Sequence, residues 1–331
     1  MAVYTEVSFS QAQELLHQLS LGELQSMEGS SGGIENTNYF VSAERDGAVA
    51  HYVLTLFERL SAEQLPFYLN LMRHLAQRGL PVPQPMANAL GQILHTVQGK
   101  PAAVVNRLPG RSQLAPTPAH CAALGATLAQ LHREGRDFDE SLPNLRGLDW
   151  WNATVPVVQP FLDATQSALI RSELAYQNHV AASSAYAALP RGPIHADLFR
   201  DNALFEGEQL TGVFDFYFAG VDSWLFDLAV CLNDWTMDPQ TAAPDAVRFA
   251  ALLQAYAQVR ALTRTERQLL PAMLRAAALR FWLSRLWDFH LPRDAQLLQA
   301  HDPGQFENIL RERAAHPVTL DVFAHPTAET P

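Results

Sequence analysis

The chain has 331 residues, of which 48% are hydrophobic and 17% charged, a composition typical of a folded globular protein rather than a disordered chain. Its 23 Lys and Arg residues against 34 Asp and Glu residues give a formal net charge of -11. Nucleic acids and anionic membranes both recruit clustered positive charge, so neither is expected as a partner. The expected partner is a small molecule, and the length favours two domains or one large two-lobed domain.

Cysteine content and the absence of targeting signals favour a cytoplasmic protein. Cys121 and Cys231 stand in apolar surroundings without metal-ligand spacing, which predicts buried thiols. Residues 1–10 contain neither the basic region nor the apolar core of a signal peptide, and no stretch of the sequence approaches 18 apolar residues. The sequence leaves the oligomeric state open.

The first part of the chain combines one short helix with a hairpin. A capping box at Ser10 and Gln13 predicts the helix, and the glycines of residues 29–33 predict a loop. Residues 37–43 and 49–57 are rich in Val, Tyr, Phe and Leu and are separated by a turn, which is typical of two paired strands.

A second helix and two further strands complete this part. Ser61 and Gln64 form another predicted capping box, and the helical periodicity ends at Gly79. Residues 92–97 and 102–108 predict strands on either side of a turn.

The remainder of the chain is mostly helical. We expect an α+β protein with two lobes: a small antiparallel sheet with one main helix in residues 1–107 and a larger helical lobe in residues 108–331, joined by a hinge at about 104–110. Residues 193–217 are the one β-rich segment of the second lobe. Helices are predicted within 121–131, over 163–188 and from a capping box at Thr265 and Gln268 to Asp288, and the tail after Pro317 is expected to be loosely ordered.

The densest group of polar residues lies in the β-rich segment. His195, Asp197 and Asn202 fall within eight residues, and Asp215 follows after a hairpin. Strands of about equal length lead out and back, so we expect Asp215 to lie beside the loop that carries the other three. One carboxylate can then face a hydroxyl, while Asn202 and Asp215 hold a hard cation through oxygen. This arrangement indicates phosphoryl transfer.

Structural explanations exist for the same residues. Asp197 and Asn202 can cap turns, and Asp227 can be an ordinary helix N-cap. His195 can be a base or a metal ligand, but a buried histidine with one hydrogen bond is commoner, so we expect it to support the loop.

The spacing His-x-Asp-x4-Asn with a downstream Asp resembles the catalytic loop and metal-binding Asp of the protein-kinase-like superfamily, in the form used by aminoglycoside and choline kinases. The resemblance implies ATP and Mg²⁺ as cofactors. It implies that Asp197 orients the attacking hydroxyl, that Asn202 and Asp215 bind Mg²⁺, and that His195 and Asp227 support the loop. Arg200 is a candidate for charge near the transferring phosphate, although a surface ion pair with Asp201 or Glu206 is the alternative.

The first lobe fits this resemblance with one departure. In that superfamily a lysine stands on the strand that follows a phosphate-covering loop, whose place is taken here by residues 32–38. The lysine is absent: Thr55 stands near its place, and the only lysine of the chain is Lys100. A phosphate anchor must then come from backbone, from Arg59 or from Lys100, whose place beside a turn favours a solvated charge. The residues expected at the nucleotide are Gly32, Gly33, Asn36, Thr37, Asn38 and Thr55, with residues 104–110 meeting adenine.

Several longer strings are similar to the homoserine kinases that have the aminoglycoside-kinase-like fold, in which Thr at the lysine position is part of the pattern. The resemblance implies ATP-dependent phosphorylation of the side-chain hydroxyl of L-homoserine to O-phospho-L-homoserine, on the way to threonine. These strings are GIENTNYFV (33–41), YVLTLFER (52–59), LAQRGLPVP (75–83), HADLFRDNALF (195–205), GVFDFYFA (212–219), NDW (233–235) and RAAALRFWLSRL (275–286).

A zwitterionic acceptor needs an acidic or aromatic group for its ammonium and an arginine or backbone amides for its carboxylate. Ordinary helix packing is the alternative for every candidate. Another small-molecule kinase of this fold, acting on choline, ethanolamine, an aminoglycoside or methylthioribose, and a non-catalytic nucleotide-binding regulator are the competing hypotheses. The candidate acceptor residues are Asp234, Trp235, Arg280, Trp282 and Arg285.

Overall fold

The computed structural model describes residues 4–30, 36–291 and 301–318, and these form two units. The first unit runs to Gly110 and includes Thr211–Tyr217. The second comprises the other described residues. The α+β fold, an antiparallel sheet unit followed by a mainly helical unit, is confirmed, and each unit is described by itself below.

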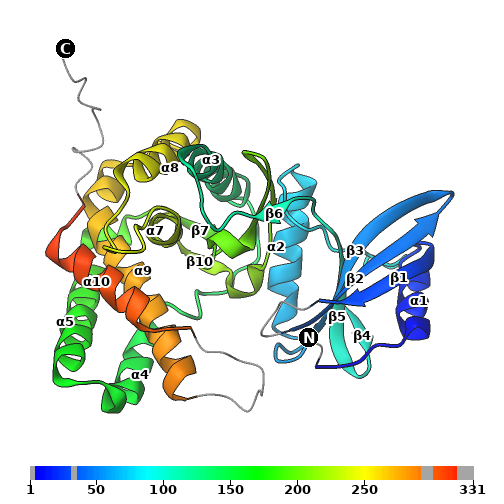
Figure 1. Cartoon of the computed structure of the whole chain (residues 1–331), viewed down its shortest axis with the longest axis horizontal. Coiled ribbons are helices and arrows are strands. Elements are labelled where there is room, and N and C mark those ends of the chain that lie inside the picture. The colour runs from blue at the N-terminus through cyan, green and yellow to red at the C-terminus, as the bar shows by residue number, and fades with distance from the viewer. Residues whose placement is uncertain (1–3, 31–35, 292–300, 319–331) are drawn as a thin grey trace. The chain divides into compact units, whose positions relative to one another are not determined.

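The first unit is built on a five-stranded antiparallel sheet with strand order β1-β2-β3-β5-β4 (Figure 1). Apolar residues of helix α1 (Phe9–Gln18) and of the central strands form one core on one face of this sheet. Helix α2 (Leu65–Gln77) is buried along its apolar stripe. The strands are β1 (Glu23–Gly29), β2 (Asn36–Arg45), β3 (Ala48–Phe57), β4 (His95–Val97) and β5 (Lys100–Asn106).

The predicted hairpin is confirmed, with Asp46 and Gly47 at positive φ in its two-residue turn. Strand β1 was not predicted, because it is an edge strand with a largely polar sequence and only Leu24 fully buried. The first helix is capped by Ser8 and Gln11 rather than by the predicted pair two residues later. Starting there, the helix turns Ala12, Leu15 and Leu16 toward the core.

The second unit surrounds a central helix, α7 (Trp224–Trp235), all twelve residues of which are buried. Nine of its twelve residues are apolar, which is typical of a helix inside a core, and the polar ones are Asp227, Asn233 and Asp234. The other helices of this part of the chain are α3 (Pro118–Glu134), α4 (Leu148–Val158), α5 (Ala164–Ala181), α6 (Ser184–Ala187), α8 (Ala246–Val259), α9 (Arg264–His290) and α10 (Gly304–Ala315). Short strands are β6 (Arg111–Ser112), β7 (Arg191–Ile194), β8 (Ala203–Glu206), β9 (Gln209–Val213) and β10 (Gly220–Ser223).

Two helix predictions need correction. The stretch 163–188 is two helices, because Ser183 caps a new helix after Ala182 ends α5. The capping box of α9 is Thr263 with Glu266, two residues before the predicted pair. The tail from residue 319 lies outside the described residues, as do Gly32 and Gly33.

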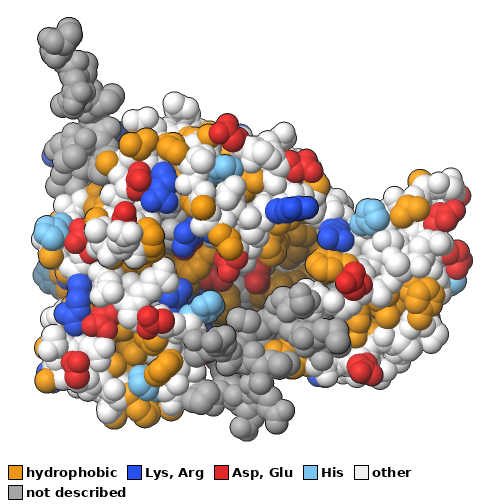
Figure 2. All heavy atoms as spheres, viewed as in Figure 1, with side chains coloured by type: hydrophobic (Ala, Val, Ile, Leu, Met, Phe, Trp, Pro, Cys, Tyr) orange, Lys and Arg blue, Asp and Glu red, His pale blue; other side chains and the backbone are white. Residues whose placement is uncertain are grey.

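Charged side chains of both signs lie on the surface of the molecule (Figure 2). On the face shown in Figure 2, Lys and Arg side chains are scattered among acidic and polar ones rather than collected in one patch. Among the described residues, no helix is both long and apolar enough to cross a membrane.

Candidate active site

The loop after β7 is fixed by one buried carboxylate. The backbone N–H groups of His195 and Ala196 donate to the two oxygens of Asp227, at 2.9 and 2.8 Å. Ala196 has φ 64°, a left-handed conformation that costs a non-glycine residue about 1 kcal/mol. The two hydrogen bonds hold this conformation. Asp227 lies inside α7, whose N-cap is Ser223, so the alternative that Asp227 is an ordinary helix N-cap is wrong.

A buried chain of hydrogen bonds continues behind Asp227. Its carboxylate accepts from His132 Nε2 at 2.9 Å, and His132 Nδ1 accepts from the hydroxyl of Tyr256 at 2.7 Å. That hydroxyl accepts from Arg260 Nη1 at 3.1 Å. Donors and acceptors alternate correctly only if the His132 ring is neutral. Sequence reasoning did not find His132, although it stands next to Leu131 of the predicted apolar face.

Burial and hydrogen bonding set the charges of this chain. Burial lowers the pKa of His132 and outweighs the opposing effect of the Asp227 charge. For Asp227, burial favours the neutral acid, but the hydrogen bonds from His132 and from the backbone of His195 hold its pKa below the ordinary value. The pair is therefore an ionised carboxylate beside a neutral imidazole.

Asp197 and Asn202 lie together, as their spacing suggested. Asn202 Nδ2 donates to the backbone oxygen of Asp197 at 2.8 Å and to its Oδ2 at 3.4 Å. His195 is buried, and its Nδ1 accepts from the Asp197 N–H at 3.3 Å. Arg280 Nη2 lies 3.9 Å from Asp197 Oδ1. The Asp197 carboxylate is thus held in a defined position and remains 18% exposed.

Arg200 and Asp234 are bound to each other. Arg200 donates from Nε and Nη2 to the two Asp234 oxygens at 3.1 and 3.2 Å, and its backbone N–H donates to Oδ2 at 2.9 Å. Its Nη1 donates to the Leu114 carbonyl. A two-pronged pair with the buried Asp234 carboxylate therefore occupies Arg200, in place of the alternative of a surface ion pair with Asp201 or Glu206. The expected roles of Arg200 at the phosphate and of Asp234 at an ammonium group stay predictions.

The remaining candidates for contact with the acceptor differ in burial and in their hydrogen-bond partners. Trp235 is fully buried and donates from Nε1 to the Leu198 carbonyl, so it supports the loop and does not line a pocket. Trp282 is also fully buried. Arg285 donates to Gln305 Oε1 at 2.6 Å and to the Asp302 carbonyl at 3.2 Å. Of these candidates, Arg280 is the one that lies at Asp197.

Asp215 belongs to the first unit, so its expected position beside Asp197 and Asn202 stays a prediction. Asp215 has φ 66°. Two residues before it, the Val213 N–H donates to the Pro81 carbonyl at 2.7 Å. Two residues after it, the Tyr217 ring meets Phe57 edge-on, with ring centres 5.0 Å apart.

The predicted nucleotide residues lie on two faces of the sheet. Asn36, Thr37 and Asn38 open β2, and the Thr55 hydroxyl donates to Asn38 Oδ1 at 2.7 Å across the hairpin. Thr37 is completely buried, and its hydroxyl donates to Glu58 at 2.6 Å. It also accepts from the backbone N–H groups of Tyr4 and Thr5. The structure therefore corrects the prediction for Thr37, which ties down the N-terminal segment.

Lys100 is not a solvated loop charge. Its ammonium group is ion-paired with Glu58, whose carboxylate is only 10% exposed. Burial favours the neutral acid of Glu58, but hydrogen bonds from Lys100, Thr37 and Thr5 hold its pKa below the ordinary value.

Donor chemistry at the loop fits a hard cation. Asn202 turns its amide nitrogen to Asp197, so the oxygen Oδ1 is the atom left for a ligand. The described residues contain no cluster of three or more His, Cys, Asp or Glu that would hold a metal without help. Mg²⁺ binds through oxygen to one or two protein side chains, together with waters and nucleotide phosphates.

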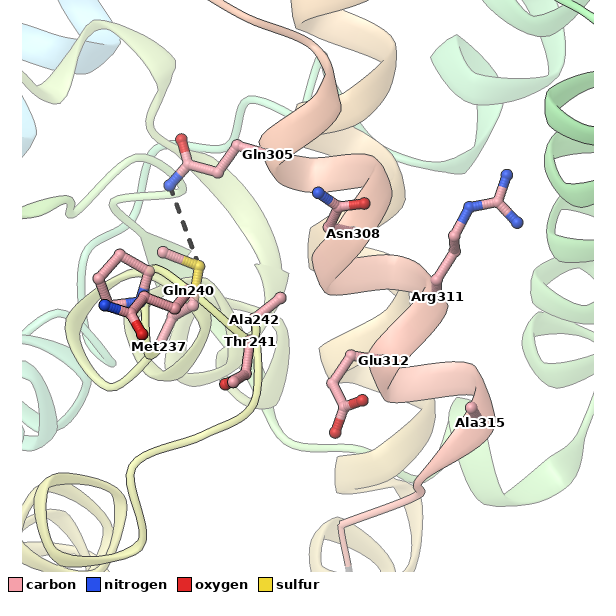
Figure 3. A pocket seen from close by; sticks show the side chains of 10 residues that line it. Met237, Gln240, Thr241, Ala242, Gln305, Asn308, Arg311, Glu312 and Ala315 are labelled. Carbon is pink, nitrogen blue, oxygen red and sulfur yellow. Dashed lines mark hydrogen bonds between the residues drawn. The ribbon is translucent and has the colours of Figure 1, made fainter.

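A surface cavity lies beside helix α10. It has a volume of roughly 480 Å³ and is lined by the loop after α7 and one side of α10 (Figure 3). None of the predicted site residues is among its lining residues.

The sheet unit and the helical unit with its Asp197–Asn202 loop define a kinase-like phosphotransferase. Two solved structures share the fold over almost the whole chain. An amicoumacin kinase in complex with AMP-PNP, Ca²⁺ and Ami has a TM-score of 0.67 at 17% identity and covers 93% of this chain and 94% of its own. A spectinomycin phosphotransferase in complex with ADP and spectinomycin also has a TM-score of 0.67, at 12% identity, and covers 94% and 99%.

Sequence comparison defines the family more closely. The model of the phosphotransferase enzyme family matches residues 26–262. The homoserine kinase of Polaromonas naphthalenivorans is 62% identical over 320 residues, 97% of this chain and 100% of that protein, and the homoserine kinase of Ralstonia nicotianae is 55% identical over 329 residues, 97% and 98%. The chain belongs to the phosphotransferase enzyme family and, within it, to the family of these homoserine kinases. The resemblance noted from its sequence is confirmed.

Proposed function

We propose that this protein transfers the γ-phosphate of ATP to the side-chain hydroxyl of L-homoserine, giving O-phospho-L-homoserine for threonine synthesis in the cytoplasm. The observation that carries the proposal is the 62% identity to a homoserine kinase over 97% of the chain. The loop geometry supports it, because a phosphotransferase needs a positioned carboxylate and a ligand for a divalent cation.

Asp197 is the proposed catalytic residue. Its carboxylate orients the acceptor hydroxyl and accepts its proton as the oxygen attacks the γ-phosphorus. The backbone bonds to Asp227 and the amide of Asn202 fix the position of this group. That fixed position lowers the entropy cost of bringing the carboxylate and the hydroxyl together.

Asn202 and Asp215 are the proposed Mg²⁺ ligands, through an amide and a carboxylate oxygen. When bound, Mg²⁺ would offset the negative charge that develops on the phosphates during transfer. Gly32, Gly33, Asn36, Asn38 and Thr55 stay proposed neighbours of the nucleotide.

Arg280 is the proposed partner of the acceptor carboxylate. Its guanidinium lies 3.9 Å from Asp197 and 3.8 Å from the centre of the Phe281 ring, and the residue is only 3% exposed. A buried planar guanidinium beside the catalytic acid can bind a carboxylate through two parallel hydrogen bonds while the acceptor hydroxyl reaches Asp197.

The test of substrate and chemistry is ADP release with ATP and Mg²⁺, comparing L-homoserine with L-serine, L-threonine, choline and an aminoglycoside. We expect turnover with L-homoserine, and a loss of about 10²–10⁴-fold in kcat for Asp197→Asn, the range for a general base. Asp201→Asn is the matched control, since Asp201 is an exposed acid four residues further along the same loop. Turnover with choline or the aminoglycoside alone would refute the homoserine assignment, and nucleotide binding without turnover would favour a regulator.

The test of the acceptor site is Arg280→Lys, which keeps the charge but loses the planar fork. We expect KM for L-homoserine to rise by about 10-fold with little change in KM for ATP, equivalent to about 1.4 kcal/mol. Arg275→Lys on the same helix is the control, because Arg275 is bound to Glu173 instead. An unchanged KM for L-homoserine in Arg280→Lys would exclude Arg280 from this role.

A further inference from the structure

The place of the absent lysine can be located on the sheet by strand register. Thr37, Leu56 and Ala102 form one cross-strand row, and Leu56 and Ala102 pack in the core shared with α1. Lys100 lies two residues from Ala102 and therefore on the same, α1-covered face. Thr55, at the lysine position, is one residue from Leu56 and points to the opposite face. Lys100 is thus on the wrong side of the sheet to replace the lysine.

Three aromatic rings lie together on the side of the sheet to which Thr55 and Phe57 point. Phe57 ends β3 and Tyr68 lies on α2, and these residues are 1% and 2% exposed. Tyr217 meets both edge-on, with ring centres 5.0 and 6.1 Å apart and interplanar angles of 78° and 80°. Edge-to-face pairs of this kind contribute beyond the area they bury.

The ring of Tyr217 lies close to a charge that needs a fixed position. Asp215 itself is in the left-handed region, which a residue with a side chain adopts only where its surroundings hold it. Contacts fix the chain on both sides of Asp215. Two residues before it, the Val213 N–H donates to the Pro81 carbonyl, and two residues after it, the Tyr217 ring packs against Phe57.

We propose that Tyr217 is a positioning residue for Asp215, and that the rings of Phe57, Tyr68 and Tyr217 tie β3 and α2 to the segment that carries this carboxylate. The inference rests on the proposed function, in which Asp215 is a Mg²⁺ ligand.

The test measures divalent cation binding directly. Mn²⁺ is titrated into the full-length protein with AMP-PNP, and free Mn²⁺ is followed by its electron paramagnetic resonance signal. We expect Tyr217→Leu to weaken Mn²⁺ binding about 10-fold, the effect typical of a residue that orients a metal ligand. Tyr217→Phe keeps the ring and should restore binding to within about twofold of the unsubstituted protein.

Tyr52→Leu is the matched control, because Tyr52 lies in the same sheet but packs against the α1 core. Its Mn²⁺ binding should be unchanged. Unaltered binding in folded Tyr217→Leu overturns the inference. If that variant does not fold, Tyr68→Leu removes the ring contact from the side of α2, and unaltered binding there overturns the inference equally.

The variant Asp215→Asn distinguishes the positioning role of Tyr217 from the metal-binding role of Asp215. Weaker Mn²⁺ binding in this variant with unaltered binding in Tyr217→Leu removes the positioning role and leaves the metal ligand in place. Full binding in Asp215→Asn removes the metal role, and with it the inference drawn from that role.

Discussion

Asp227 is the residue whose loss should most damage the catalytic loop without touching substrate. Replacing it by Asn keeps the size of the side chain and removes its charge. The carboxylate accepts three hydrogen bonds, from two backbone N–H groups and from His132. An amide has one oxygen, so at least one buried donor faces an NH₂ group instead of an acceptor.

The magnitude follows from the same contacts. A buried donor left unsatisfied costs about 1–3 kcal/mol, and each hydrogen bond to a charged group contributes about 1.5–3 kcal/mol. We therefore expect Asp227→Asn to lower the free energy of unfolding by about 3–5 kcal/mol. His132→Leu, which leaves the two backbone bonds to Asp227, should cost about 2–4 kcal/mol, and Tyr256→Phe, at the outer end of the chain, about 1–2 kcal/mol.

Urea unfolding of the three variants measures the order, provided the m-value is unchanged. Hydrogen exchange at the amides of His195 and Ala196 measures the local effect, and both amides should exchange faster in Asp227→Asn at urea concentrations far below the transition. His179→Leu, an exposed histidine on α5, is the control for loss of an imidazole. If Tyr256→Phe and Asp227→Asn lowered the free energy of unfolding equally, or if Asp227→Asn lowered it by less than about 1 kcal/mol, the supporting role of Asp227 would be refuted.

Three further outcomes follow from buried charges and thiols. Burial lowers the pKa of His132, so the unfolded chain binds a proton below about pH 6.5 that the folded chain does not bind. The free energy of unfolding should therefore fall as the pH drops below that value, by up to about 1.4 kcal/mol per pH unit. This contribution should be absent in His132→Leu. Glu58→Gln should lower the free energy of unfolding by about 1–3 kcal/mol by weakening three charge-assisted bonds, whereas Glu63→Gln at an exposed position should have little effect by the same urea assay. Burial raises the pKa of Cys121 to about 12 and that of Cys231 as well, so iodoacetamide at pH 8 should label neither thiol before unfolding, and rapid labelling of the folded protein would contradict their burial.

The parts of the site that could be predicted from sequence are those made by neighbours in the chain. Asp197 and Asn202 are five residues apart, and a single loop brings them together. The bond between His132 and Asp227 joins residues 95 apart in the sequence, and neither residue type indicates the other. Such a pair becomes predictable only when the packing of α3 against the central helix is known.

Helix boundaries failed for a related reason. Ser8 and Ser10 are both able to cap a helix, and each has a glutamine three residues later. Local chemistry does not choose between them. The choice is made by the core, because a helix that starts after Ser8 turns its apolar residues onto the sheet.

The five-residue spacing of the arginines in α9 indicates their neighbours only when it is known that they lie on one helix. Arg275, Arg280 and Arg285 look equivalent in the sequence, but five residues turn a helix by about 140° beyond a full turn, so successive members face different neighbours. Accordingly Arg275 is bound to Glu173 and Arg285 to Gln305. The middle residue faces Asp197. Helix geometry alone therefore forbids a pocket lined by all three, and it leaves Arg280 as the member that can serve an acceptor at the catalytic loop.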